Sequence, residues 1–178
     1  VPREVKVLNA IKVSGRTKNG LGIGIFNAIT KKTEASITNT ETGEQRKEVV
    51  EPFANYNVLV VDQLFNGNSS VSLINTNVMR EGNFRDANVT GLVTNLQNKR
   101  NTYNIVAEAK MSNVNHQFET NETGYSSFFY IGKSHGKFRY SFDHSFADTK
   151  YDINDLGLIL RNNYNDFGAD VSYRIFEP

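Results

Sequence analysis

The sequence predicts an all-β chain that folds as an antiparallel meander of hairpins. Apolar and polar residues alternate with a period of two along most of the 178 residues, which is the spacing of side chains on one face of a strand. Turn-forming residues recur between these stretches, with Asn present 23 times and Gly 13 times. No stretch keeps a helical period for more than a turn or two, and Asn and Gly are both poor helix formers.

The strands of the first half are expected at residues 5–15, 21–30, 34–38, 46–50, 56–65 and 71–79. Lys18-Asn19-Gly20 joins the first two, and Asn-Gly is the strongest short hairpin signal because both residues tolerate positive φ. Turns around Glu41-Thr42-Gly43-Glu44 and Asn66-Gly67-Asn68 join two further pairs. The run Val58-Leu59-Val60-Val61 is apolar on both faces, so we expect something to cover the inner side of that strand.

The strands of the second half are expected at residues 87–96, 102–112, 114–120, 125–133, 138–147, 156–163 and 167–176. Their alternation is sharper than that of the first half. Phe138, Tyr140 and Phe142 share one face, for example, while Arg139 and Asp143 take the other. The sequence therefore predicts about twelve antiparallel strands in a single region spanning residues 1–178.

This one-sided alternation fits two architectures. In a soluble β-sandwich the apolar face packs on a second sheet, whereas in an outer-membrane barrel it faces lipid and the polar face lines a lumen. The barrel is favoured because the expected strands approach the roughly 9–11 residues of a tilted membrane-spanning strand. Short turns, aromatic residues near strand ends and polar faces of mixed charge favour it as well. We therefore expect a transmembrane β-barrel segment that belongs to a larger barrel.

The composition argues against several other classes of protein. Lys and Arg together number 20, and Asp and Glu 19, so a nucleic-acid binder that acts through bulk positive charge is not expected. The chain has no Cys, which excludes disulfides, thiolate metal sites and cysteine nucleophiles within it. No apolar run approaches the roughly 20 residues of a transmembrane helix. No cofactor is expected.

Several motifs of the sequence resemble those of one protein family. They lie at residues 8–17, 20–28, 51–52, 55–60, 74–78, 86–91 and 152–157. The most specific are the first hairpin, which includes Gly20-Leu21-Gly22-Ile23-Gly24-Ile25-Phe26, and the run Asp152-Ile153-Asn154-Asp155-Leu156-Gly157. With these motifs, nearly the whole chain from Leu8 to Pro178 resembles the C-terminal barrel region of large Bacteroidota-type outer-membrane proteins of unknown function.

The resemblance carries three implications. It implies an outer-membrane location and a barrel region longer than this chain, so the chain is expected to be part of a longer polypeptide. Members of the family usually carry an N-terminal β-sandwich similar to family-9 carbohydrate-binding domains, which is absent from this sequence. The family has no established catalytic residues, so the resemblance implies none here.

In a barrel, the polar faces of the strands would line the lumen. The candidates for lumen-facing polar residues are Glu108, Lys110, Asn115, Gln117, Glu119, Arg139, Asp143, Arg161, Asp170 and Arg174. They would either line a polar pore or the docking surface of a plug, or form a charge network that fills a closed barrel. Acids such as Asp143 and Asp170 are an imaginable acid and base, but nothing in the sequence sets their separation, so no catalytic residue is assigned.

No metal site is assigned from the sequence. A three-histidine zinc site would require His116, His135 and His144 to converge, and they lie on separate strands or turns. One loop gathers oxygen ligands and is a calcium candidate, with Asp148, Asp152, Asn154 and Asp155. Their spacing matches no EF-hand loop, and Asp and Asn are also common turn formers.

The expected function is that of a non-catalytic pore, scaffold or docking platform in the bacterial outer membrane. The expected partners are outer-membrane lipid and either other envelope proteins or the remainder of the same chain, and not nucleic acid. The alternative is a soluble all-β binding module of the bacterial envelope, with glycans as the candidate ligand. A third hypothesis, an envelope enzyme that acts on glycans through two facing acids, is required by no motif.

Overall fold

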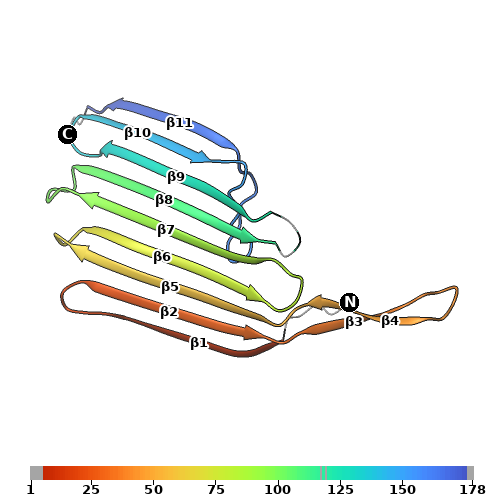
Figure 1. The fold of residues 1–178 in the computed structure, drawn as a ribbon. Coiled ribbons are helices and arrows are strands. Elements are labelled where there is room, and N and C mark those ends of the chain that lie inside the picture. Colours follow the sequence, from red (N-terminus) through yellow and green to blue (C-terminus); the bar gives the residue numbers. More distant parts are fainter. Residues whose placement is uncertain (1–5, 117, 119, 176–178) are drawn as a thin grey trace.

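The described residues of the chain fold into two antiparallel β-sheets. The computed structural model describes residues 6–116, 118 and 120–175. The larger sheet has nine strands in the order β1-β2-β5-β6-β7-β8-β9-β10-β11, and the smaller is the β3-β4 hairpin (Figure 1). The strands are β1 Val7–Arg16, β2 Leu21–Thr30, β3 Thr33–Thr38, β4 Gln45–Glu51, β5 Ala54–Phe65, β6 Ser69–Arg80, β7 Asp86–Gln97, β8 Tyr103–Asn115, β9 Glu122–Lys133, β10 Phe138–Ala147 and β11 Tyr164–Tyr173. The described residues include no helix long and apolar enough to cross a membrane.

The predicted all-β antiparallel meander is confirmed, and the part of the chain that the structure describes has eleven strands where about twelve were expected. Each strand of the larger sheet pairs with its neighbour in register over most of its length, as β5 and β6 do from Ala54–Arg80 to Phe65–Ser69. The sheet is open, and β1 and β11 are its two edges. The β3-β4 hairpin is inserted between β2 and β5 and projects beyond the end of the sheet (Figure 1).

Two expected strands are wrong. The described residues of the range 114–120 form no strand of their own, because Val114 and Asn115 continue β8 and Val114 pairs with Glu122 of β9. The range 156–163 forms a turn and an irregular segment instead of a strand. Side-chain amides hold this segment, since Asn154 Oδ1 accepts from Ile159 N at 2.8 Å and Asn162 Nδ2 donates to Thr149 O at 3.0 Å. These local hydrogen bonds take the place of a strand ladder.

The two ends of the larger sheet carry different connections. Short turns follow β1, β5, β7 and β9 at one end, and Asn66, Gly67 and Asn101 adopt the positive φ that such turns require. At the opposite end lie the β3-β4 hairpin, the connections 81–85 and 148–163, the end of β8 and the start of β9. We call these ends the short-turn end and the long-loop end. All longer connections therefore gather on one side of the molecule.

Candidate functional site

The nine-stranded sheet has two faces of different chemistry. Residues that pair directly across strands lie on the same face, so the register assigns every strand residue to one face. Face A carries the row Ile23, Val61, Leu73, Leu92 and Ala109. Face B carries the neighbouring row Gly24, Val60, Ile74, Gly91 and Lys110.

Charged residues are segregated between these faces. Among the described strand residues of the larger sheet, the Asp, Glu, Lys and Arg residues of face A are Asp86 and Lys133, which lie at opposite ends of their strands. Those of face B are Lys12, Arg16, Asp62, Arg80, Glu108, Lys110, Glu122, Arg139, Asp143, Asp166 and Asp170. The central part of face A is therefore uncharged, whereas face B carries both signs along its length.

Face A exposes large apolar side chains. Phe167 and Val171 of β11 are each 67% exposed, and Ile25 of β2 is 52% exposed. Met111, Phe129 and Phe142 are also exposed. Large apolar side chains exposed together on one sheet face are typical of surfaces that contact a partner or a membrane.

Face B carries most of the small residues of the sheet. The strand glycines on face B are Gly22, Gly24, Gly91, Gly124, Gly132 and Gly168, whereas Gly15 lies on face A. At Gly132 the ring of Tyr130 occupies the space that a Cβ would need, and at Gly168 the carboxylate of Asp143 does so. Glycine in a strand permits close approach of another group or a bend of the sheet.

The segment 148–163, which we call the strap, folds onto face B. Tyr151 is 3% exposed, and its hydroxyl bonds with Ser126 of β9. Asp152 N donates to Ser112 Oγ of β8 at 3.1 Å. A Cβ on Gly124 would overlap the backbone of Lys150 and Tyr151, so glycine is required where the strap crosses β9.

Two arginines at the long-loop end hold the acids of the strap. Arg85 lies between β6 and β7 and pairs with Asp152 at 2.9 Å and with Asp155 at 2.8 Å. Arg80, at the end of β6, pairs with Asp155 at 2.7 Å, and the Asp155 side chain is only 7% exposed. These ion pairs join the strap to strand ends far away in the sequence and are partly shielded from water.

The environment of the strap shifts two pKa values. Burial disfavours the charged form of Asp152, but the Asn154 N–H and the Arg85 guanidinium outweigh it and hold the pKa of Asp152 below its usual value. Burial, with the nearby Tyr164 as a smaller cause, raises the pKa of Tyr151 to about 12. The strap is therefore anchored by a carboxylate that favours its charged form and a phenol that favours its neutral form.

A cavity of about 170 Å³ lies between the strap and the sheet. Ile74, Val89 and Val93 form its sheet side, and Ile153 and Leu156 form its strap side. Apolar walls on both sides show that the strap packs on the sheet through side chains as well as through ion pairs.

The register places the predicted lumen-facing residues as follows. Glu108, Lys110, Arg139, Asp143 and Asp170 lie on face B, and Glu108 pairs with Lys110. Asn115 lies on face A, because it pairs with Asp86 and is an odd number of residues from Lys110. Its assignment to the same face as Glu108 and Lys110 is therefore corrected.

Two further candidates, Arg161 and Arg174, lie outside the strands of the sheet. Arg161 belongs to the strap, where it pairs with Asp166 at 3.2 Å, because the expected strand 156–163 is absent. Arg174 follows β11, and its backbone N–H donates to Lys137 O. Gln117 and Glu119 lie outside the described residues. That any of these residues lines a lumen stays a prediction.

The acids of the predicted calcium loop bond with different partners and do not face one common point. Asp148 accepts hydrogen bonds from Tyr125 N and Lys150 N, while Asp152 and Asp155 face the arginines. Asn154 accepts from Ile159 N. Within the described residues no group of three or more His, Asp or Glu is arranged to hold a metal ion. A calcium site in this loop stays a prediction.

The histidines lie in separate places. His144 of β10 stacks on Phe167 at 4.4 Å between ring centroids and bonds with Asn165 Oδ1 at 2.7 Å on face A. His135 lies in the turn after β9 and bonds with the Ser134 hydroxyl. His116 follows β8 at the long-loop end.

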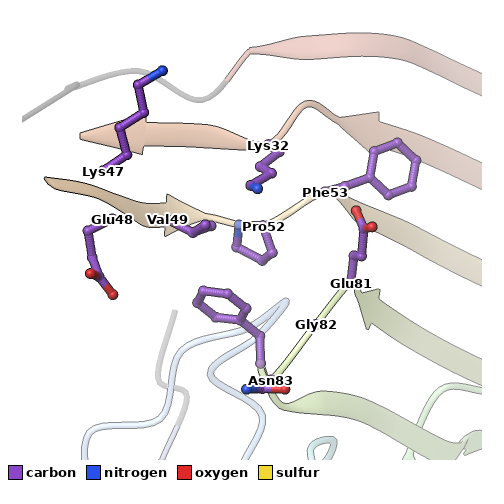
Figure 2. Close-up of a pocket in the computed structure, with 10 residues that line it drawn as sticks. Lys32, Lys47, Glu48, Val49, Pro52, Phe53, Glu81, Gly82 and Asn83 are labelled. Carbon is purple, nitrogen blue, oxygen red and sulfur yellow. The ribbon is translucent and has the colours of Figure 1, made fainter. Parts of the chain in front are cut away.

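A second hollow lies where the β3-β4 hairpin meets the connection between β6 and β7. This cleft has a volume of about 490 Å³. Figure 2 shows Lys32 and Pro52 on its hairpin side and Glu81 and Asn83 on its other side. Glu81 N donates to Phe53 O at 2.9 Å, which ties the two sides together. The cleft contains cations and acids on exposed chain segments, so its charges do not select one class of ligand.

The sequence analysis did not predict the strap or the residues that hold it, such as Gly124 and Arg85. Arg85 and Asp152 are 67 residues apart, and no local pattern links them. The run Asp152-Ile153-Asn154-Asp155-Leu156-Gly157 was recognisable as a motif, and its acids are the ones that the arginines hold. No pattern in the sequence marks Gly124 as the residue over which the strap crosses β9.

Comparison with known proteins relates this chain to one family. A family model described as a domain of unknown function, DUF5916, matches residues 1–178. No curated protein matches the chain. No solved structure matches it either.

Proposed function

The chain belongs to the DUF5916 family, and from the two faces of its sheet we propose that it is a non-catalytic segment of an outer-membrane β-barrel wall. In this proposal face A contacts lipid and face B faces the barrel interior, where the strap lies. The segment acts as a pore wall, a scaffold or a docking platform. The family description assigns no activity, so the proposal rests on the chemistry of the sheet.

The segregation of charge is the observation that carries the proposal. A solvated sheet face has no reason to exclude charge, whereas Arg or Lys at the midplane of a bilayer costs about 2–4 kcal/mol. Face A keeps its two charged strand residues, Asp86 and Lys133, at opposite ends of the strands. The exposed apolar side chains between those ends fit contact with hydrocarbon.

The height of the apolar band supports the same proposal. On β8 the face A residues from Tyr103 to Met111 are apolar or aromatic. At about 3.4 Å per residue they span roughly 27 Å along the strand. A barrel tilt of about 40° reduces this to roughly 21 Å, close to the apolar band of about 25 Å in outer-membrane barrels.

The direction of the edge strands supports membership in a larger barrel. With nine antiparallel strands in the sheet, β1 and β11 run in the same direction. Direct closure would join them as a parallel pair, whereas bacterial barrels have an even number of antiparallel strands. We therefore propose that an odd number of further antiparallel strands completes the wall.

Single cysteines test the proposal, because the chain has no native Cys. A spin label is attached to Leu92→Cys on face A and, as the matched control on the same strand, to Asn95→Cys on face B. Both variants are studied in membranes of the cells that produce the full polypeptide. We expect dissolved oxygen, which concentrates in hydrocarbon, to relax the label at residue 92 more strongly. A water-soluble nickel chelate should relax the label at residue 95 more strongly.

Two results would reject the proposal. One is equal access of the nickel chelate to residues 92 and 95, and the other is recovery of the polypeptide wholly in the soluble fraction. Either result would favour the soluble binding module instead. The exposed aromatic residues Phe138, Tyr140 and Tyr173 would then be its candidate contacts for sugars.

A further inference from the structure

Five asparagines form a continuous row across face A. Asn27, Asn57, Asn77, Asn88 and Asn113 pair directly with one another across β2, β5, β6, β7 and β8. We call this set the amide row. It lies toward the long-loop end of the sheet, two residues along each strand from the row Ile25, Leu59, Asn75, Thr90 and Met111. On β2, β5 and β8 face A thus changes from apolar side chains to amides between these two rows. On β6 and β7 the uncharged polar side chains begin one row earlier, at Asn75 and Thr90.

The amide row retains free hydrogen-bonding capacity. Asn27 Nδ2 donates to Asn57 Oδ1 at 2.8 Å, and Asn113 Oδ1 accepts from Thr123 Oγ1 at 2.9 Å. Asn27 and Asn57 also donate to Asn55 Oδ1, and Asn88 exchanges hydrogen bonds with Asn75. Each amide has two donor hydrogens and an acceptor oxygen with two lone pairs, so these bonds leave part of the capacity of the row unused. The amides are half-exposed, and within the described residues the Asn77 side chain makes no hydrogen bond. A ligand that both donates and accepts hydrogen bonds would complete the row.

The charges around the amide row define the class of ligand. The charged strand residue nearest to it on face A is the anion Asp86, while Lys133 lies at the short-turn end. Arg80 and Arg85, at the same end of the sheet as the row, pair with Asp155 and Asp152 of the strap. A phosphate or another anionic headgroup would therefore meet an acid without a neighbouring strand cation on this face. An uncharged sugar, whose hydroxyls donate and accept, suits a row of amides.

We propose that the amide row binds the uncharged saccharide headgroups of glycolipids in the leaflet on the long-loop side. This inference rests on the proposed function, because it requires face A to contact lipid. The apolar band then lies in the acyl chains, and the amides lie at the level of the headgroups. The long-loop end, with the β3-β4 hairpin and the strap, faces out of the membrane on that side.

The test measures which lipid stays with the protein. The full polypeptide is reconstituted in nanodiscs of phosphatidylcholine that contain equal amounts of digalactosyldiacylglycerol and phosphatidylglycerol. Lipids retained after gentle detergent extraction are then counted by native mass spectrometry. We expect at least tenfold enrichment of the glycolipid over the anionic lipid. Equal retention, or preference for phosphatidylglycerol, would overturn the inference without need of any variant.

Matched variants locate the binding. N77L/N88L removes two neighbouring amides of the row and should abolish the enrichment, while N77Q/N88Q keeps the amide chemistry and should retain it. The control N95L/N104L removes a hydrogen-bonded amide pair from face B, at 2.8 Å, and should retain the enrichment. Equal loss in the control and in N77L/N88L would place the binding elsewhere and overturn the inference.

The spin label at residue 92 separates the two proposals. If this label contacts hydrocarbon but the wild-type protein shows no glycolipid enrichment, face A is lipid-facing and the inference about the amide row is wrong. If the label does not contact hydrocarbon, the proposed function fails and the inference fails with it.

Discussion

Replacing Gly124 with Ala should release the strap from face B and leave the nine-stranded sheet in place. The Cβ of alanine would come within 3.0 Å of Tyr151 N and Lys150 C, which are backbone atoms and cannot rotate away. The strap would have to withdraw by on the order of 1 Å, and overpacking of this kind costs about 1–3 kcal/mol. The cost falls on the strap because Gly124 itself is held in the ladder by its pairing with Ser112.

Limited trypsin digestion measures this release, because the strap contains Lys150 and Arg161. Cleavage follows the population of the open strap when opening is fast compared with cleavage. A loss of about 1–3 kcal/mol raises that population roughly 5-fold to 150-fold, since about 1.4 kcal/mol corresponds to a factor of ten. We expect cleavage at both sites to accelerate within that range.

Gly15→Ala is the matched control, because a Cβ at this strand glycine meets nothing within 4 Å. Its strap should be cleaved at the wild-type rate. The reasoning is refuted if Gly124→Ala is cleaved no faster than Gly15→Ala while circular dichroism shows the strands of both variants intact. Such a result would mean that the strap does not rest on β9 in solution.

The ion pairs and the buried phenol of the strap lead to two further predictions. The pKa of Asp152 is lowered in the folded protein, so the charged carboxylate stabilises the docked strap. This stabilisation is fully present above the unfolded pKa of about 3.9 and is lost as the pH falls through the folded pKa. Arg85→Gln removes one cause of that lowering, so pepsin cleavage near Leu160 should begin at a higher pH than in the wild type. Arg161→Gln, which breaks an exposed pair, should not shift it, and equal onsets in the two variants would contradict the assignment. The pKa of Tyr151 is raised to about 12 in the folded protein. The neutral phenol therefore stabilises the docked strap below about pH 10, which is the unfolded pKa of tyrosine, and this contribution is lost as the pH rises toward 12. The ultraviolet difference between wild type and Tyr151→Phe should therefore titrate near pH 12, and titration near 10 would show that the phenol is exposed.

The strands of the sheet could be predicted because their signal is local. A period of two in a segment such as 138–147 identifies a strand without knowledge of its partner, and Asn-Gly at residues 66–67 identifies the turn that follows Phe65. The face of each residue follows from the same parity. Asn115 was misassigned because the expected strands 102–112 and 114–120 interrupted a strand that is continuous from Tyr103 to Asn115.

The strap could not be predicted because its order depends on distant contacts. Leu156, Leu158 and Leu160 alternate as a strand would, but none of the described strands pairs with them, and Leu160 is 91% exposed. Hydrogen bonds from Asn154 and Asn162 close the segment on itself. Its docking depends on Gly124 and Arg85, which precede it by many residues. Period alone cannot distinguish such a segment from a strand.

The sequence by itself determined that this chain forms strands, where most of them turn and which side of each strand is charged, because these properties depend on residues close together in the chain. Only the tertiary structure decided how the strands align. The asparagines at positions 27, 57, 77, 88 and 113 have no regular spacing, and they form one row because each pair of strands adopts a particular register. The position of the strap also depends on the tertiary structure. Gly124 leaves room for the strap backbone, Arg80 and Arg85 pair with its acids, and only the folded sheet brings these residues to the strap.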